Sequence, residues 1–324
     1  MKKAIALLLA ALLALSLTAC ATEKSGKNPP QTSGAKESRE PGQATKESTP
    51  TEAQTESEQA QTETAPAKTE PPEDFAEVTV IDTDDCLLRI TEIDAESIWG
   101  YTLKIYLENR TSDKTLMFAT SDGAVNGVAW DPYFAAEVAP GKKGNQELFF
   151  LNEKLEALLP EFTDIELAFR VYDSDDLFAD DLADETVHIY PLGEENASVY
   201  VREPQPTDTV LVDNDQFTVI VTGYEKGNGS IWGYAAELWI VNKTDMSLTF
   251  ANDEVSVNGF MCDPFWAVSV APGKSALSTM SWTDDSLEEN GITEVQEIEM
   301  LFRVYDSENW SAGTIFEETV TLKP

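Results

Sequence analysis

Histidine and cysteine are almost absent from this chain of 324 residues. His188 is the single histidine, and the three cysteines are Cys20, Cys86 and Cys262. The chain shows no Ser/His/Asp or Cys/His arrangement, no paired histidine metal ligands and no phosphate-binding glycine loop. The cysteines also lack the spacing of a zinc site. We therefore expect a protein that is not an enzyme, with His188 on the outward face of a strand.

Basic side chains are also scarce. Lys and Arg total 22 against 59 Asp and Glu, which gives a formal net charge of −37. Such an acidic chain repels phosphate backbones and anionic headgroups, which argues against nucleic acids and anionic membrane surfaces as partners. Divalent cations, basic proteins or a need for solubility are each compatible with this charge, and solubility is the commonest reason.

Long apolar runs are missing except at the N-terminus. Lys2 and Lys3 precede an Ala/Leu/Ile-rich run over residues 4–15, which is typical of an export signal and too short for a permanent membrane span. The run leads into Leu17-Thr18-Ala19-Cys20. This block resembles the lipobox of bacterial lipoproteins, and the resemblance implies cleavage after residue 19 and a lipid on Cys20.

The resemblance to lipoproteins also predicts a location. Residues 1–19 would form the signal peptide, and Cys20 would hold the mature chain on the extracytoplasmic side of the cell membrane. That side is the cell surface, or the periplasm where the envelope has two membranes. Two or more acyl chains give stable anchoring without a transmembrane helix. The alternative is an ordinary secretory signal followed by a chance cysteine.

Residues 20–75 contain Phe75 as their only aromatic side chain and are rich in Thr, Ser, Glu and Pro. This composition offers too little apolar surface to offset chain entropy, so we expect a disordered acidic tether. A flexible chain of this length spans about 40 Å on average. The segment either carries the rest of the protein away from the membrane or serves only as a soluble spacer.

The rest of the chain is an internal duplication. Six blocks occur in the same order in residues 76–200 and again in residues 201–324, which is a specific signal of two copies of one domain. The blocks of the first copy are Ser97–Tyr101, Asn109–Thr111, Val125–Gly127, Asp131-Pro132, Val138–Lys142 and Phe169–Ser174. We call residues 76–200 repeat 1 and residues 201–324 repeat 2.

Both repeats have the hydrophobic alternation of β-strands. Apolar residues at every second position over 101–107 and 234–240 predict strands with one buried face. The frequency of such strands predicts an all-β fold of two tandem antiparallel immunoglobulin-like β-sandwiches. The repeats resemble the tandem immunoglobulin-like domains of bacterial surface lipoproteins that are grouped with telokin-like domains of unknown function. This resemblance covers residues 76–324 and implies a fold and a location, but no activity.

Local chemistry predicts where the chain turns. Asn126-Gly127 and Asn258-Gly259 favour tight hairpin turns, in which both central residues need a positive φ. Short helices are predicted over residues 152–159 and 284–289, because each follows a potential N-cap and carries acidic residues early.

The two cysteines outside the lipobox align with large apolar residues of the other repeat. Cys86 aligns with Phe217, and Cys262 aligns with Trp130. Buried free thiols are therefore favoured over a disulfide between them.

Aromatic side chains supply the candidate ligand contacts. Exposed rings on a sandwich stack on sugars or anchor a protein partner. The candidates lie on the less apolar face of a strand or after the shared Asp-Pro pair, and they are Tyr106, Trp239, Tyr133, Phe134, Phe265 and Trp266. Trp99 and Trp232 each open a strand beside a glycine. We interpret these two as core residues, with exposure as the alternative.

An acidic loop is the one candidate for a cation. Asp173, Asp175, Asp176 and Asp180 could supply several oxygen ligands to calcium. The EF-hand pattern fails because Phe178 stands where the turn glycine belongs, and repeat 2 has far fewer carboxylates here. A solvated acidic loop is favoured, with weak calcium binding as the alternative; no other cofactor is expected.

A non-catalytic binding or adhesion module on the cell surface, for a protein or glycan ligand, is the function that these features favour. Two alternatives remain. One is a structural envelope or stalk component with no ligand, which should lack a large exposed aromatic patch. The other is an enzyme, which would need a carboxylate pair facing a deep cleft.

Overall fold

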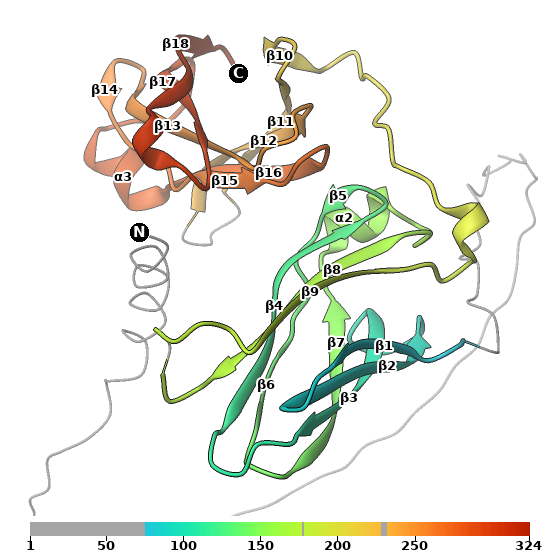
Figure 1. Ribbon diagram of the computed structural model, residues 1–324. Coiled ribbons are helices and arrows are strands. Elements are labelled where there is room, and N and C mark those ends of the chain that lie inside the picture. The colour runs from blue at the N-terminus through green and yellow to red at the C-terminus, as the bar shows by residue number, and fades with distance from the viewer. Residues whose placement is uncertain (1–74, 177, 228–231) are drawn as a thin grey trace, which may run out of the picture. The chain divides into compact units, whose positions relative to one another are not determined.

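The chain from Phe75 onward is almost entirely β-structure (Figure 1). The computed structural model describes residues 75–176, 178–227 and 232–324. The predicted signal peptide, Cys20 and the tether up to residue 74 lie outside these residues. The predicted all-β class is confirmed. Among the described helices, none has the length and apolar character needed to cross a membrane.

Repeat 1 consists of two facing sheets. One has the strand order β1-β2-β3-β7, and the other has the order β5-β4-β8-β9, with β6 beside β4. The elements are β1 (Val78–Asp82), β2 (Cys86–Asp94), β3 (Tyr101–Asn109), β4 (Leu116–Val125), β5 (Val128–Ala129), β6 (Ala135–Val138), β7 (Lys143–Phe150), α2 (Glu153–Leu158), β8 (Ile165–Asp173), β9 (Ala183–Ile189) and the 3-10 turn η1 (Glu194–Asn196).

Repeat 2 has the same plan. Its sheets have the orders β10-β11-β12-β16 and β14-β13-β17-β18, with β15 beside β13. The elements are β10 (Thr209–Asp213), β11 (Phe217–Lys226), β12 (Trp232–Asn242), β13 (Leu248–Val257), β14 (Phe260–Met261), β15 (Ala267–Val270), β16 (Ser275–Thr283), α3 (Asp284–Glu289), β17 (Ile298–Asp306), η2 (Trp310–Ala312) and β18 (Thr314–Leu322).

One short parallel pairing joins the repeats. Ser275 of β16 pairs with Val128 of β5, so one sheet of each repeat becomes part of a single nine-stranded sheet. The residues of the two repeats belong to one compact unit. A division into separate domains at residue 200 therefore stays a prediction, although each repeat has its own hydrophobic core.

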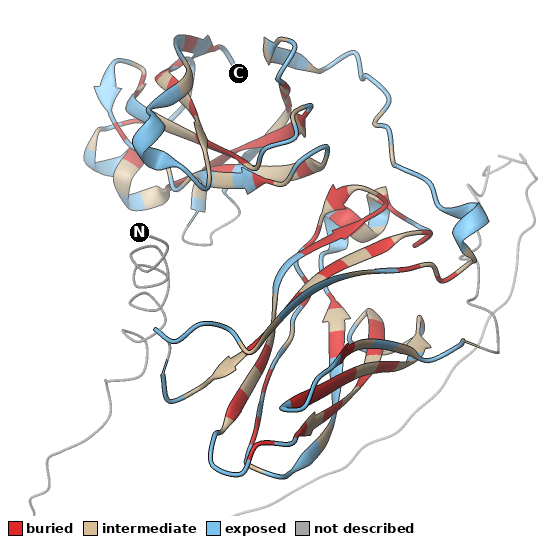
Figure 2. Ribbon diagram, viewed as in Figure 1, coloured by how far each residue is buried: buried red, intermediate tan, exposed pale blue. Residues whose placement is uncertain are grey.

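Each core lies between the two sheets, and buried residues alternate with less buried ones along the strands (Figure 2). The two cores differ at one pair of neighbouring positions, where a large and a smaller side chain have changed places. In repeat 1, Trp130 packs edge-on against Phe150, with 5.5 Å between the ring centroids. In repeat 2 the corresponding residues are Cys262 and Trp282, and the Trp282 indole donates a 2.9 Å hydrogen bond to the Cys262 carbonyl. A small thiol therefore fits where the tryptophan has moved to the neighbouring strand. As predicted, both described cysteines are buried free thiols.

The predicted turns and helices are confirmed. Asn126 and Gly127 have φ values of 51° and 76°, and Asn258 and Gly259 have φ values of 51° and 82°. The carbonyl oxygen of the Asn152 side chain accepts hydrogen bonds from the first backbone N–H groups of α2, and Thr283 caps α3 in the same way. These features depend on residues within a few positions of each other.

The repeated Asn-x-Thr block fixes the end of a central strand. Asn242 is 1% exposed, and its amide donates hydrogen bonds of 2.8 Å to the carbonyls of Met246 and Val270. Its side-chain oxygen accepts from the backbone N–H and the hydroxyl of Thr244. Asn109 makes the corresponding bonds in repeat 1. In both repeats the block therefore supplies hydrogen-bond donors to buried carbonyls at the end of the strand.

One row on the outer face of the β11-β12-β16 sheet is apolar and covered by repeat 1. Ile220, Trp239 and Leu277 lie in one row across the three strands. Trp239 is 3% exposed, belongs to the core cluster of repeat 1 and packs edge-on against Tyr200 at 5.8 Å. A strand that is covered on both faces carries apolar residues on both. We call these three residues the apolar row.

The corresponding row of repeat 1 is polar. It consists of Arg89, Tyr106 and Asn145, in the same register across β2, β3 and β7. The ammonium of Lys143 lies 5.9 Å from the centre of the Tyr106 ring and forms a 3.3 Å ion pair with Glu108. We call Arg89, Tyr106 and Asn145 the polar row. The two rows occupy equivalent places, but among the residues that the structure describes only the apolar row is covered by the other repeat.

Candidate functional site

Three aromatic side chains of repeat 1 form a cluster at the surface. Trp99 is 51% exposed and Tyr133 is 58% exposed, and both contact Phe149 of β7. The Tyr133 and Phe149 rings are stacked at 5.3 Å with an interplanar angle of 14°, and Trp99 lies 6.0 Å from Phe149 at 32°. The backbones of Tyr133 and Phe149 are bridged by hydrogen bonds, which fixes their spacing. We call this group aromatic cluster 1.

Repeat 2 has a smaller group at the corresponding place. Trp232 is 38% exposed and Phe265 is 67% exposed, and their rings meet edge-on at 5.6 Å. Ser281 replaces the phenylalanine and bridges the backbone of Phe265. We call Trp232 and Phe265 aromatic cluster 2. Both copies thus place two aromatic rings at the start of the same strand.

The interpretation of Trp99 and Trp232 as core residues is wrong. Each stands at the entry to a central strand, and its side chain is exposed. The buried tryptophan positions are instead filled by Trp130 and Trp282. The Ser-Ile-Trp-Gly-Tyr block that contains Trp99 and Trp232 is identical in both repeats, and that was the available signal for a role outside the core.

The glycine after each tryptophan allows close approach. Gly100 has a φ of 85°, and a Cβ built on it would overlap the carbonyl oxygen of Phe150. A Cβ on Gly233 would overlap Asp284 at the start of α3. Glycine therefore lets the start of β3 lie directly against the end of β7, and the start of β12 against the end of β16. This close approach holds each tryptophan beside the adjacent strand.

Gly100→Ala is therefore expected to lower the free energy of unfolding by at least about 2–3 kcal/mol, from φ strain together with the overlap. Gly141→Ala is the matched control, because Gly141 also has a positive φ of 64° but nothing lies within 4 Å of its Cβ position. It should lose only about 1–2 kcal/mol. Urea unfolding of both variants measures the difference, and equal losses would show that the contact at Gly100 has no energetic weight.

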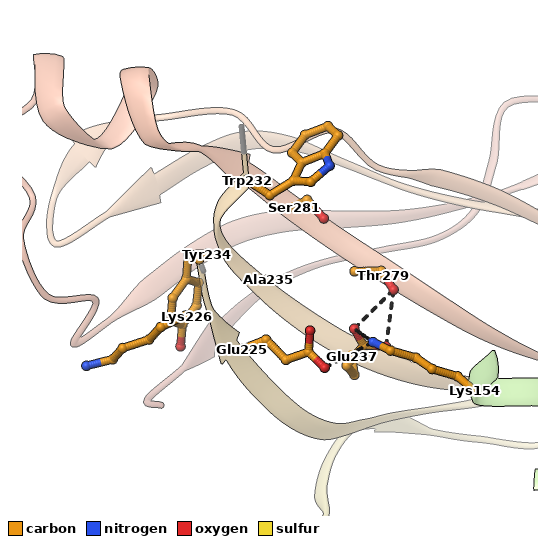
Figure 3. A pocket seen from close by; sticks show the side chains of 10 residues that line it. Lys154, Glu225, Lys226, Trp232, Tyr234, Ala235, Glu237, Thr279 and Ser281 are labelled. Carbon is orange, nitrogen blue, oxygen red and sulfur yellow. Dashed lines mark hydrogen bonds and ion pairs between the residues drawn. The ribbon is translucent and has the colours of Figure 1, made fainter. Parts of the chain in front are cut away.

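A pocket of about 420 Å³ adjoins aromatic cluster 2 (Figure 3). Trp232 borders it, and Glu237 and Thr279 project from β12 and β16 into it. Lys154 of α2 contributes from repeat 1. The volume lies within the range of small-molecule sites, about 300–1,000 Å³. The remaining lining residues are Glu225, Lys226, Gly227, Tyr234, Ala235 and Ser281.

A buried carboxylate gives this pocket its polar character. Glu237 is 7% exposed, and one of its oxygens lies 2.7 Å from the Lys154 ammonium. The Thr279 hydroxyl lies 3.1 and 3.2 Å from the two carboxylate oxygens, and Glu225 lies 3.0 Å from the same ammonium. Burial lowers the pKa of Lys154, but hydrogen bonds to Glu237 and Glu225 outweigh it and hold that pKa above its ordinary value. The pocket thus combines fixed donors and acceptors with an indole wall.

The structure separates the predicted aromatic residues into two groups. Tyr133 and Phe265 are exposed and belong to the clusters. Their neighbours Phe134 and Trp266 point inward, and each packs 5.9 Å from a core phenylalanine. The prediction of an exposed ring at Trp239 is wrong, because repeat 1 covers that residue.

Tyr106 is half-buried beneath Lys143, with its hydroxyl 3.4 Å from a Glu108 oxygen. Sequence reasoning did not find Phe149, Lys154 or Glu237. Lys154 and Glu237 meet from positions 83 residues apart, and nothing in the local pattern marks either.

The acidic loop after β8 uses its carboxylates to cap its own backbone. Asp173 accepts a hydrogen bond from the backbone N–H of Asp175, and Asp176 accepts from that of Phe178. Asp180 is exposed. Within the described part of the chain, no group of three or more His, Cys, Asp or Glu side chains is placed to hold a metal ion. The calcium hypothesis stays an untested prediction.

Comparisons with known proteins leave the function open. No family model and no curated protein matches the chain. Among solved structures, the YadV chaperone is 13% identical with a TM-score of 0.24, over 74% of this chain and 100% of its own. A protein of unknown function from Porphyromonas gingivalis W83 is 14% identical with a TM-score of 0.18, over 69% and 91%. Red sea bream transglutaminase is 11% identical with a TM-score of 0.20, over 73% and 31%. These values carry no inference about activity.

Proposed function

We propose that this protein is a non-catalytic glycan-binding module, lipid-anchored through Cys20 and displayed outside the cell membrane on the tether of residues 20–75. Aromatic cluster 1 is the observation that carries the proposal. Trp99 and Tyr133 expose more than half of their surface. Large rings that are exposed together, rather than singly, are typical of surfaces that bind a ligand or partner.

The shape of the cluster supports a sugar as the ligand. Phe149 contacts both other rings: it is stacked with Tyr133 at 14° and tilted by 32° from Trp99, so the three rings form one aromatic surface. The apolar face of a pyranose ring packs against such surfaces. Farther along the same sheet face lie the Lys104 ammonium and the Glu147 carboxylate, which form an ion pair and offer partners for hydroxyl groups.

Duplication adds a second contact. Cluster 2 and its pocket offer an indole face, a carboxylate and an ammonium at the corresponding strand of repeat 2. A polymer that engages both clusters gains avidity, because the second contact forms at a high effective concentration.

A glycan array followed by calorimetry tests the proposal. Trp99→Ala with Tyr133→Ala is expected to weaken binding at least tenfold, which corresponds to about 1.4 kcal/mol. Adding Trp232→Ala and Phe265→Ala should abolish binding. Trp310→Ala is the control: Trp310 is 47% exposed and packs against Tyr305 outside both clusters, so affinity should not change. Absence of any glycan ligand for the wild-type chain contradicts the proposal.

A structural stalk is the second candidate. The short pairing of β16 with β5 favours it, because a sheet shared between repeats restricts their relative motion. A stalk requires no ligand, so all cluster variants should then behave like the wild-type chain in every binding assay while keeping its location.

A further inference from the structure

The hairpin tip of repeat 1 is docked on repeat 2. This tip, tip 1, is residues 126–129. The Ser275 N–H donates a 2.9 Å hydrogen bond to the Gly127 carbonyl, Val128 is fully buried, and Ala129 packs against the core cluster of repeat 2. The backbone N–H of Tyr200 donates to the Asn126 carbonyl, and its ring packs on Trp239 of the apolar row.

Two polar contacts frame this docking. The Lys274 ammonium forms an ion pair with Glu166 beside tip 1, and Lys154 reaches Glu237. The internal interface therefore has two parts: tip 1 pairs with the edge strand β16, and repeat 1 covers the apolar row beside that edge.

The same tip in repeat 2, residues 258–261, has no such cover among the described residues. This tip 2 has the same turn geometry as tip 1. At the positions of Val128 and Ala129 it carries Phe260 and Met261, which are 52% and 64% exposed. Glu299, the counterpart of Glu166, is exposed on the adjacent strand. The uncovered tip is thus more apolar than the covered one.

A second copy of the chain does not offer the surface that tip 2 fits. The apolar row is already covered by repeat 1 of its own chain. The polar row of repeat 1 would place Arg89 and Asn145 against Phe260, with the Lys143–Glu108 ion pair beside them. Burying such groups without matched partners costs more than the apolar contact returns.

We propose that tip 2 is a docking surface for a β-sandwich domain of another protein, one with an open edge strand beside an apolar row on its outer sheet face, as β16 and the apolar row provide for tip 1. Phe260 and Met261 would take the places of Val128 and Ala129. Glu299 would meet a basic side chain of the partner, as Glu166 meets Lys274 here. This interaction is separate from glycan binding, because neither aromatic cluster takes part.

Transplanting the apolar row within the chain tests this docking. Arg89→Ile, Tyr106→Trp and Asn145→Leu convert the polar row into an apolar one, in a Cys20→Ser background that lacks only the lipid. We expect the Cys20→Ser chain without the graft to stay monomeric. The grafted chain should form head-to-tail oligomers at micromolar concentrations, which analytical ultracentrifugation measures. Adding Phe260→Asp should restore the monomer, whereas Phe178→Asp, at another exposed phenylalanine, should not.

Three outcomes overturn the proposal. The first is that the grafted chain folds but stays monomeric. The second is that its oligomers persist with Phe260→Asp, because the grafted face would then associate without using tip 2. The third is that the chain without the graft oligomerises through Phe260, which would mean that tip 2 docks on a second copy of this chain. Circular dichroism verifies folding, and the milder graft Arg89→Ile with Asn145→Leu repeats the measurement if the triple graft unfolds. Glycan binding should be unchanged by Phe260→Asp.

Discussion

Asn242→Ala is expected to lower the free energy of unfolding by roughly 3–5 kcal/mol, a large fraction of the stability of an ordinary domain. The substitution leaves the carbonyls of Met246 and Val270 without their amide donor and removes the acceptor of Thr244. An unsatisfied buried polar group costs about 1–3 kcal/mol, and here several are created at once.

Urea unfolding followed by tryptophan fluorescence, to which the buried Trp282 of repeat 2 contributes, measures this loss. Asn214→Ala is the matched control, because the Asn214 side chain also accepts two backbone hydrogen bonds, from Gln216 and Phe217, but in a more exposed loop. It should cost about 1 kcal/mol. A loss for Asn242→Ala no larger than the control would show that water replaces the lost amide.

Cys20→Ser is expected to move the protein from the membrane fraction to the medium, or to the periplasm where there are two membranes. Each buried methylene of an acyl chain contributes about 0.8 kcal/mol to membrane binding, so removing the lipid removes the anchoring energy. The rest of the chain cannot replace it, because its charge is strongly negative and it contains no further long apolar run.

Cell fractionation with immunoblotting measures the redistribution. Cys262→Ser is the control, since Cys262 is a buried thiol of repeat 2 and its replacement should leave the protein in the membrane fraction. Retention of Cys20→Ser in that fraction would refute lipid anchoring through this residue. It would also remove the anchored display on which the proposed function rests.

The apolar row shows how a correct strand prediction led to a wrong surface. Alternation over residues 234–240 identified β12 and its inner face. The outer face was interpreted as polar enough to expose Trp239, although Ala235 and Val241 lie on that face as well. The corresponding face of β3 carries Thr102 and Glu108. The contrast between the repeats was visible in the sequence, but its cause, a covering repeat, was not.

Aromatic cluster 1 shows the opposite error, because Trp99 was interpreted as a core residue and is exposed. Trp99 and Tyr133 are separated along the chain and meet only through Phe149, whose position depends on the pairing of β3 with β7. Repetition of the Trp-Gly pair marked a place that both copies retained. It did not reveal that the core already held its tryptophan elsewhere.

The sequence by itself determined the duplication, the all-β class, the asparagine-glycine turns and the helix caps. Periodicity, positive φ preferences and capping act between residues that are close along the chain, so the pattern contains the answer. Only the tertiary structure decided which outer face is covered, that Lys154 meets Glu237, and that Phe260 stays exposed while Val128 is buried. Those outcomes depend on how whole sheets pack across long separations, where equivalent positions of two homologous repeats take opposite environments.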